Sequence, residues 1–405
     1  MAQKRNSALT FVFITMLIDV IGIGIIIPGI PDLLKHITGG TLSDAAEEGG
    51  LLMSSYAIMQ FFFSPIIGGL SDKYGRRPVL LASLFGFGID YLLTGFATNI
   101  FWLFAGRIFA GIFGASFSTA GAYIADVSEP EKRAQNFGLI GAAFGLGFIL
   151  GPMIGGFVIK LGERAPFFVA AALALLNFVY GYFALPESLK PENRREFEWK
   201  RANPIGTLRQ MFKYDSVLAL IIPFILITIA GYATQSTWAY FTREQFGWDG
   251  TMVGYSLAMV GLMAAIVQGG LTRVVIPKLG MEKSIYIGLV LWAVGYVMYA
   301  MATEGWMMFA FTVIAALGGI AMPALQGIMS NAVPPNEQGE LRGGLTSLMS
   351  LTAIIGPLLM SYSFAYFTDK KNSIYLPSIP FWIGAGLVFI SLIWIFQALK
   401  KKVQD

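Results

Sequence analysis

The chain has 405 residues and a net charge of +4; 56% of its residues are hydrophobic and 13% are charged, whereas soluble globular proteins carry about 25% charged residues. With 33 Phe, 18 Met and 8 Trp, its apolar surface exceeds what water-facing domains can bury, so lipid is the expected solvent for most of it. The chain has no cysteine, which excludes a disulfide scaffold, a Cys-ligated metal and a thiol nucleophile. It has a single histidine, His36, which argues against a His-rich metal centre.

A helix that crosses a hydrocarbon core of about 30 Å needs roughly 20 mostly apolar residues. Twelve such stretches follow one another along the chain, separated by polar or turn-rich breaks. Because these runs lack the alternation of barrel strands, we predict an all-α polytopic membrane protein with twelve transmembrane helices. In chain order the predicted spans are 8–34, 48–71, 79–97, 100–125, 136–160, 165–185, 217–241, 250–275, 283–302, 305–332, 342–367 and 379–398.

The basic residues indicate the orientation of these spans. With the N-terminus placed inside, 21 of the 28 lysines and arginines fall on the inner side, 6 fall on the outer side and Arg107 lies within a span. In membrane proteins the loops with an excess of lysine and arginine typically face the cytoplasm. We therefore predict a multi-pass protein of the inner (cytoplasmic) membrane with both termini in the cytoplasm.

The longest polar stretch lies near the middle of the chain, after the sixth span. Related residues also recur 204 or 205 positions apart, among them Gly114 and Gly318, and Pro152 and Pro357, which indicates an internal duplication. We predict an N-terminal six-helix half, a cytoplasmic linker loop and a C-terminal six-helix half at residues 1–185, 186–216 and 217–405.

Three charged residues inside the spans stand out, because a charge at a helix centre costs about 2.5 to 3.5 kcal/mol and needs a partner or a function. Asp19 lies near the middle of the first span, where removal from water favours the protonated carboxyl. It can load and release a proton, bind substrate, or serve as a structural hydrogen-bonded acid. Asp90 and Arg107 flank the turn between spans three and four at equal depth. They can form a static ion pair, or couple protonation to movement. All three are candidate proton-coupling residues.

Uncharged polar and aromatic side chains within the spans are candidates for binding a polar organic solute. Amides donate and accept hydrogen bonds, and aromatic rings stack on planar ligands. For any single amide, a hydrogen bond between helices is the competing interpretation. The candidate substrate-binding residues are Gln60, Tyr123, Gln235, Trp238, Gln268 and Gln326.

The string GGLSDKYGRR at residues 68–77 combines spaced glycines with an acid and a basic pair. It resembles the loop between helices two and three of the major facilitator superfamily, at Gly68, Asp72, Gly75, Arg76 and Arg77. The resemblance implies a twelve-helix fold of two six-helix halves with the substrate site between them. It also implies a gating motif, in which the acid and the arginine latch the inner gate against neighbouring helix ends.

Two further strings are similar to motifs of drug–proton antiporters. Leu103, Arg107 and Gly111 match a fourth-helix arginine motif, and GLGFILGPMIGG at residues 145–156 matches a fifth-helix glycine-proline motif. Glycines permit close helix approach, and a proline frees a carbonyl and bends its helix, which suits an interface that moves. Gly151 and Pro152 therefore join the predicted gating motif.

Across nearly its whole length the chain resembles tetracycline efflux proteins. The matching strings are LIDVIGIGIIIP around Asp19, DYLL from Asp90, FGW from Phe246 and PALQG from Pro323. The resemblance implies export of a tetracycline, carried as its Mg²⁺ chelate, in exchange for an incoming proton.

The chain departs from enterobacterial members of that group at two places. Those proteins carry an acid within helix nine and a histidine within helix eight, where this chain has Trp292-Ala293 and Ala264. Proton coupling would then rest on Asp19 and Asp90.

The predicted function is a proton-coupled antiporter that exports tetracycline-like drugs by alternating access. The alternative is a proton-coupled carrier of another amphiphilic solute. The chain has no GxxxxGK[ST] string for ATP and no recognisable nucleophile–base cluster, so we expect a secondary transporter and not an enzyme. No permanently bound cofactor, no nucleic-acid partner and a monomeric state are expected.

Overall fold

The computed structural model describes residues 2–114, 116–129, 132–197, 199, 215–334 and 338–404. Within these ranges every regular element is a helix, and twelve helical segments are long and apolar enough to cross a membrane. The predicted all-α polytopic fold with twelve spans is confirmed. The first span ends later than predicted, at Thr38, because a helix resumes after its proline break.

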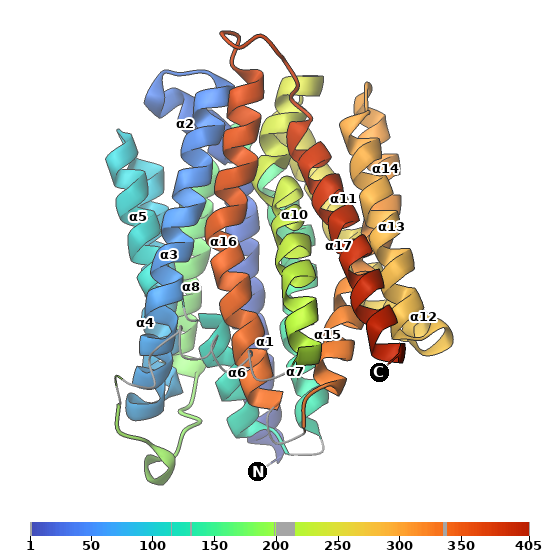
Figure 1. Ribbon diagram of the computed structural model, residues 1–405. Coiled ribbons are helices and arrows are strands. Elements are labelled where there is room, and N and C mark those ends of the chain that lie inside the picture. Colours follow the sequence, from blue (N-terminus) through green and yellow to red (C-terminus); the bar gives the residue numbers. More distant parts are fainter. Residues whose placement is uncertain are drawn as a thin grey trace. The chain divides into compact units, whose positions relative to one another are not determined.

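The first six spans run from α1 to α8 (Figure 1). Spans one and four each consist of two helices, and the others are single helices, one of them with a short 3₁₀ extension. The elements are α1 (Ala2–Ile26), η1 (Ile27–Gly29), α2 (Ile30–Thr38), α3 (Leu42–Tyr74), α4 (Arg76–Phe96), α5 (Ile100–Phe113), α6 (Ser116–Val127), α7 (Arg133–Val158), η3 (Ile159–Leu161) and α8 (Ala165–Ala184).

The last six spans run from α10 to α17, after a short 3₁₀ turn, η4 (Pro191–Asn193). Spans eight and ten are interrupted, the first by a π-helical turn and the second by a 3₁₀ turn. The elements are α10 (Asp215–Phe246), α11 (Gly250–Ile266), η5 (Val267–Leu271), α12 (Thr272–Leu279), α13 (Met281–Ala300), α14 (Gly305–Leu317), η6 (Gly318–Ile320), α15 (Ala321–Asn331), α16 (Gln338–Thr368) and α17 (Ile379–Gln404).

The interruptions fall where the sequence lacks a Cβ or a backbone N–H. Pro28 and Pro31 follow α1, and the chain passes through η1 before α2 begins, because proline cannot donate the helical hydrogen bond. Gly114 ends α5, and Gly318 begins η6. These two glycines are 204 residues apart in the sequence, so the two halves of the chain break at related positions.

The contacts group the chain into two compact units. Unit one comprises residues 1–39, 55–203 and 250–261, and unit two comprises residues 40–54, 204–249 and 262–405. The first part of α3 therefore belongs with the second unit, and the first part of α11 belongs with the first unit.

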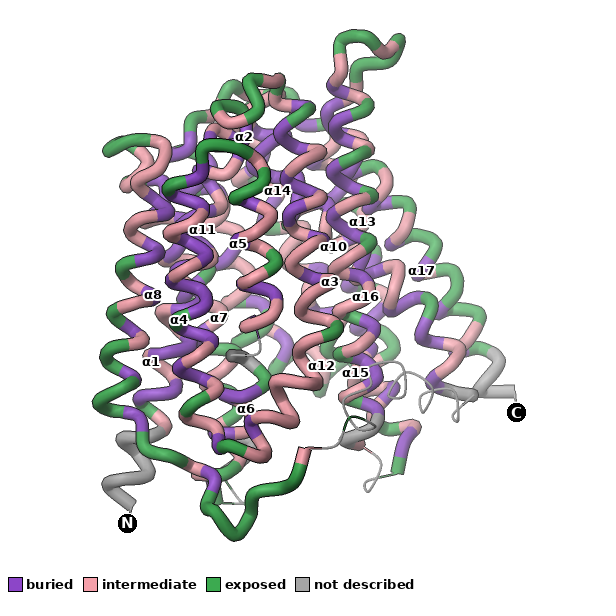
Figure 2. Tube along the Cα trace, turned by 90° about the vertical axis from the view of Figure 1, so that its left-hand side faces the viewer, coloured by how far each residue is buried: buried purple, intermediate pink, exposed green. Residues whose placement is uncertain are grey.

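The packing of unit one positions the residues discussed below. The helix pairs α1–α7 and α4–α8 are in extensive contact, and α4 carries buried residues from Leu80 to Gly95 (Figure 2). Large apolar side chains such as Phe96, Phe101 and Phe183 remain exposed on the surface of this unit. Exposed apolar surface of this extent is what a lipid-facing bundle requires.

Candidate functional site

An ion pair between α4 and α5 forms the centre of the candidate site. Arg107 Nη2 donates to Asp90 Oδ2, and only 1% of the Asp90 side chain is exposed. A Cβ at Gly106 would lie 2.7 Å from Asp90 Oδ1, so glycine beside the arginine makes room for the acid. The sequence placed these two charges at equal depth without fixing their helix faces, and the structure brings them together.

Asp19 lies in the same unit, on α1, with 6% of the residue exposed. It interacts electrostatically with the phenols of Tyr56 and Tyr91, and both phenols also interact with Asp90 and Arg107. These five residues come from α1, α3, α4 and α5. We name them the central polar cluster.

Gly22 on α1 leaves room for the side chain of Tyr91, which comes from α4. A Cβ at Gly22, one turn after Asp19, would lie 3.3 Å from the Tyr91 hydroxyl oxygen. Sequence reasoning did not identify Tyr56 and Tyr91 as site residues. Two signals could have found them: Tyr91 belongs to the DYLL string, and Tyr56 lies one helical turn before Gln60.

Gln60 connects the cluster to the break in span four. Its Nε2 donates to Tyr56 Oη at 3.1 Å and to the Gly114 carbonyl at 2.9 Å. The helix break at Gly114 exposes this carbonyl, and the amide of Gln60 satisfies it. Contact between Gln60 and a substrate stays a prediction.

The other candidate substrate residues are distributed over both units. Tyr123 is fully buried in unit one, and its hydroxyl donates to the Pro186 carbonyl at 3.0 Å. Trp238 is 1% exposed in unit two, where its ring packs edge-on against Tyr299 and Phe381 with centroids 5.1 and 6.4 Å away. In the same unit Gln235 and Gln268 are exposed and Gln326 is half-buried. Their roles in substrate binding also stay predictions.

Residues 68–77, which we name the motif loop, comprise the last turns of α3, Gly75 and the first two residues of α4. Arg76 Nη1 donates to Asp72 Oδ1 at 2.5 Å, and Arg76 Nε donates to Asp126 Oδ2, on α6, at 3.2 Å. Gly75 has a φ of +110°, a conformation that favours glycine. The arginine thus ties the acid of its own loop to a second helix, although the sequence had not singled out Asp126.

The other two candidate gating residues of the motif loop, Gly68 and Arg77, have different surroundings. Arg77 Nη2 donates to the Tyr182 carbonyl of α8 at 2.6 Å. A Cβ at Gly68 would meet no atom within 4 Å, so no close approach requires a glycine there. The predicted gating roles of both residues remain predictions.

The glycine-proline string of α7 lies against α1. A Cβ at Gly151 would lie 2.8 Å from the Gly24 Cα, and one at Gly24 would lie 2.9 Å from the Gly151 Cα. Only bare backbones can approach this closely. The string therefore joins the helix that carries Asp19 to its neighbour.

An adjoining side of α7 packs against the first part of α11. Thr251 Oγ1 donates to the Gly156 carbonyl at 2.8 Å. Pro152 has no N–H to pair with the Phe148 carbonyl, and a Cβ at Gly261 would lie 2.8 Å from this carbonyl oxygen. The carbonyl that Pro152 frees thus lies at a helix–helix contact.

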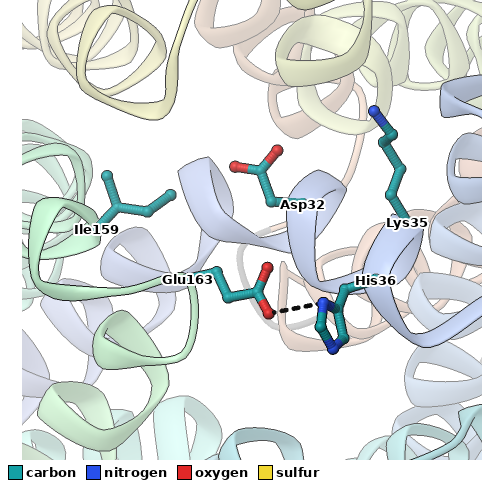
Figure 3. A pocket seen from close by; sticks show the side chains of 5 residues that line it. All are labelled: Asp32, Lys35, His36, Ile159 and Glu163. Atoms are coloured by element: carbon teal, nitrogen blue, oxygen red, sulfur yellow. Dashed lines mark ion pairs between the residues drawn. The ribbon is translucent and has the colours of Figure 1, made fainter.

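An open cavity of about 490 Å³ lies elsewhere in unit one, lined by Asp32, Lys35, His36, Ile159 and Glu163. Figure 3 shows His36 on α2 facing Glu163, with Nδ1 and Oε1 3.2 Å apart. The His36 side chain is 61% exposed, and solvent-exposed ion pairs contribute little. No residue of the cavity belongs to the central polar cluster.

The described residues hold no group of three or more His, Asp or Glu side chains that could bind a metal.

Comparisons with known proteins identify the family and relatives of the chain. The family model described as Major Facilitator Superfamily matches residues 12–302 and 274–404. The class C tetracycline resistance protein of Escherichia coli is 40% identical over 392 residues, which cover 96% of each chain. The class B protein of Escherichia coli is 36% identical over 96% of this chain and 94% of its own.

A solved structure supports the fold. The bacterial homologue of the human lysosomal transporter Spinster, in an inward-facing and unoccupied conformation, matches with a TM-score of 0.79. The match covers 99% of this chain and 98% of that chain, at 16% identity.

Proposed function

The chain belongs to the Major Facilitator Superfamily, and from this premise we propose that it exports tetracycline-like drugs in exchange for protons by alternating access. Its 40% identity to a tetracycline resistance protein over nearly the full length of both chains supports drug efflux. The central polar cluster supports proton coupling, because two carboxylates and one guanidinium in a lipid-spanning bundle need a function. The protein is a multi-pass membrane protein.

Within the cluster we assign the proton to Asp19. The Arg107 guanidinium pairs with Asp90, and Asp19 interacts electrostatically with the phenols of Tyr56 and Tyr91. A buried carboxyl among phenols can exist in a protonated and an ionised form as its exposure to water changes. Asp19 thus takes up a proton in one state and releases it in the other, while the ion pair of Asp90 and Arg107 responds to that change in charge.

The proposed substrate is a tetracycline that enters as its Mg²⁺ chelate, so Mg²⁺ is cargo. The described part of the chain offers no metal-binding group of its own, and a chelate needs none because the drug supplies ligands. The departures at Ala264 and Trp292 make another amphiphilic solute the competing substrate.

For the membrane and its orientation, we propose the inner membrane with both termini in the cytoplasm. The distribution of the 28 basic residues supports this sidedness. The functional repeat consists of residues 1–185 and 217–405, joined by residues 186–216, and glycine breaks 204 residues apart support the duplication. The protein acts as a monomer.

The direct test measures uptake of tetracycline with Mg²⁺ into inside-out membrane vesicles that contain the full chain. Uptake should require an imposed proton gradient and should stop when a protonophore collapses it. Asp19→Asn should abolish gradient-driven uptake, because the amide keeps the shape of the side chain and cannot titrate.

Asp32→Asn is the matched control, since it makes the same substitution in the same span at an open cavity. It should transport as the unmodified chain does. Gradient-driven uptake that survives Asp19→Asn would remove the assignment of the proton to this residue. A folded chain that takes up another amphiphilic compound but no tetracycline would replace the proposed substrate.

A further inference from the structure

The segment that follows α8 docks on the motif loop. Lys73 Nζ donates to Glu196 Oε2 at 3.0 Å, and the Arg195 backbone N–H donates to the Asp72 carbonyl at 3.1 Å. A Cβ at Gly69 would lie 2.9 Å from the ring of Phe197. All these residues belong to unit one. Residues 187–197, which we name the strap, therefore lie against the motif loop.

Glu187 makes the contacts at the start of the strap. Its Oε1 accepts from the Arg76 backbone N–H at 2.8 Å, and its Oε2 accepts from the Arg77 backbone N–H at 3.2 Å. Oε1 also accepts from the N–H groups of Ser188 and Leu189, both at 3.0 Å. One carboxylate thus receives two N–H groups of the first turn of α4 and two of its own loop.

These contacts satisfy a need that the sequence of α4 leaves open. The first N–H groups of a helix have no partner within the helix, and a negative charge is favourable there. Gly75 precedes α4 and offers no side-chain cap. Glu187 supplies the cap from a position 111 residues away.

Glycine is the only residue type at position 75 that allows the Glu187 carboxylate to cap α4. A Cβ at position 75 would overlap the Glu187 carboxylate, and the φ of +110° is strained for any other residue. The glycine of the motif loop is therefore explained by the strap.

Ser188, the next residue of the strap, binds Asp126, which in turn binds the Arg76 side chain. Ser188 Oγ donates to Asp126 Oδ2 at 2.9 Å, and the same oxygen accepts from Arg76 Nε at 3.2 Å. Glu187 fixes the backbone of Arg76, and Ser188 holds the acid that Arg76 binds. Only 11% of the Arg76 side chain is exposed.

We propose that Glu187 is a positioning residue of the transport cycle: it caps α4 so that Arg76 bridges Asp72 and Asp126, and it makes the strap part of the gate. This inference rests on the proposed transport function. Since Glu187 follows α8 and binds the first turn of α4, it acts on the rate of the conformational change and not on substrate affinity.

The test compares Glu187→Gln with Glu192→Gln in the full chain. Glu192 lies in the same strap and its carboxylate comes no closer than 4.0 Å to Lys190, so it is a matched control. We expect Glu187→Gln to lower the maximal rate of tetracycline uptake per folded protein about five-fold, the factor for the loss of one helix cap of about 1 kcal/mol. The tetracycline concentration that gives half-maximal uptake should not change in Glu187→Gln. Glu187→Asp should restore part of the maximal rate, and Glu192→Gln should behave as the unmodified chain.

Amide hydrogen exchange of the first turn of α4 gives a readout that does not depend on transport. Exchange at Arg76 and Arg77 should accelerate about five-fold in Glu187→Gln. Gly75→Ala should have the same effect, because it displaces the carboxylate from the other side. Unchanged exchange in both variants, or a changed half-saturation with an unchanged maximal rate, would overturn the positioning role. Failure of the unmodified chain to transport, with exchange altered as expected, would instead overturn the proposed function.

Discussion

At the scale of single residues, the ion pair of Asp90 and Arg107 has the largest energetic consequences. The Asp90 side chain is 1% exposed and the Arg107 side chain is 20% exposed. Breaking such a pair by removing one partner leaves an uncompensated buried charge and costs about 3–5 kcal/mol, whereas replacing both partners costs much less.

This asymmetry predicts the behaviour of two variants. Arg107→Leu should lower the unfolding temperature in detergent strongly, because Asp90 loses its cation. Adding Asp90→Asn to that variant should restore part of the stability, because the buried charge is then gone. A double variant that is less stable than Arg107→Leu alone would contradict the buried ion pair.

How far single residues could be predicted depends on the distance over which they act. The equal depth of Asp90 and Arg107 follows from their positions on either side of one turn. Tyr56 could not be assigned, because its approach to the acids depends on which face of α3 meets α5. Glu187 could not be assigned either, since it caps a helix 111 residues away and no local pattern reports such a contact.

At the scale of elements, α7 packs closely against two other helical segments of unit one. It packs backbone to backbone against α1 through Gly151, and against the first part of α11 through Gly156. The glycine-proline string indicated close helix packing, but the partners of each face could not be read from it. In a uniformly apolar sequence no polar stripe distinguishes one face of a helix from another.

Two glycine substitutions in α7 separate packing from helix propensity. Gly151→Ala should destabilise the protein by about 1–3 kcal/mol, because its Cβ would lie 2.7 Å from the Ile21 carbonyl oxygen. Gly141→Ala should leave stability unchanged or raise it, because a Cβ there meets nothing within 4 Å and alanine favours the helix. Unfolding temperatures in detergent distinguish the two, and equal effects would contradict the close contact of α7 with α1.

At the scale of the whole molecule, each unit contains a segment from the other half of the sequence: residues 250–261 belong to unit one and residues 40–54 belong to unit two. A Cβ at Gly50, in α3, would lie 3.1 Å from the Pro357 carbonyl oxygen of unit two, and one at Gly254, in α11, would contact the Pro152 carbonyl of unit one. Gly50 and Gly254 are 204 residues apart in the sequence. Ser54 Oγ adds a hydrogen bond to the Ile354 carbonyl at 2.7 Å. The repeat thus appears in the contacts as well as in the sequence.

The number of spans could be predicted because the thickness of the hydrocarbon core dictates helix length. The exchange of segments could not, because the two parts of α3 read as one continuous apolar helix although they belong to different units. The interruptions were partly predictable: prolines marked the break after α1, whereas the π-helical turn of η5 has only Gly269 and Gly270 as its local signal.

The central claim is that one drug molecule leaves in exchange for a proton carried by Asp19. The most direct measurement follows the internal pH of acidified inside-out vesicles that contain the full chain, before and after addition of tetracycline with Mg²⁺. Our account predicts that the drug raises the internal pH with the unmodified chain and has no such effect with Asp19→Asn. Drug uptake without a change in internal pH, or an equal change with Asp19→Asn, would contradict it.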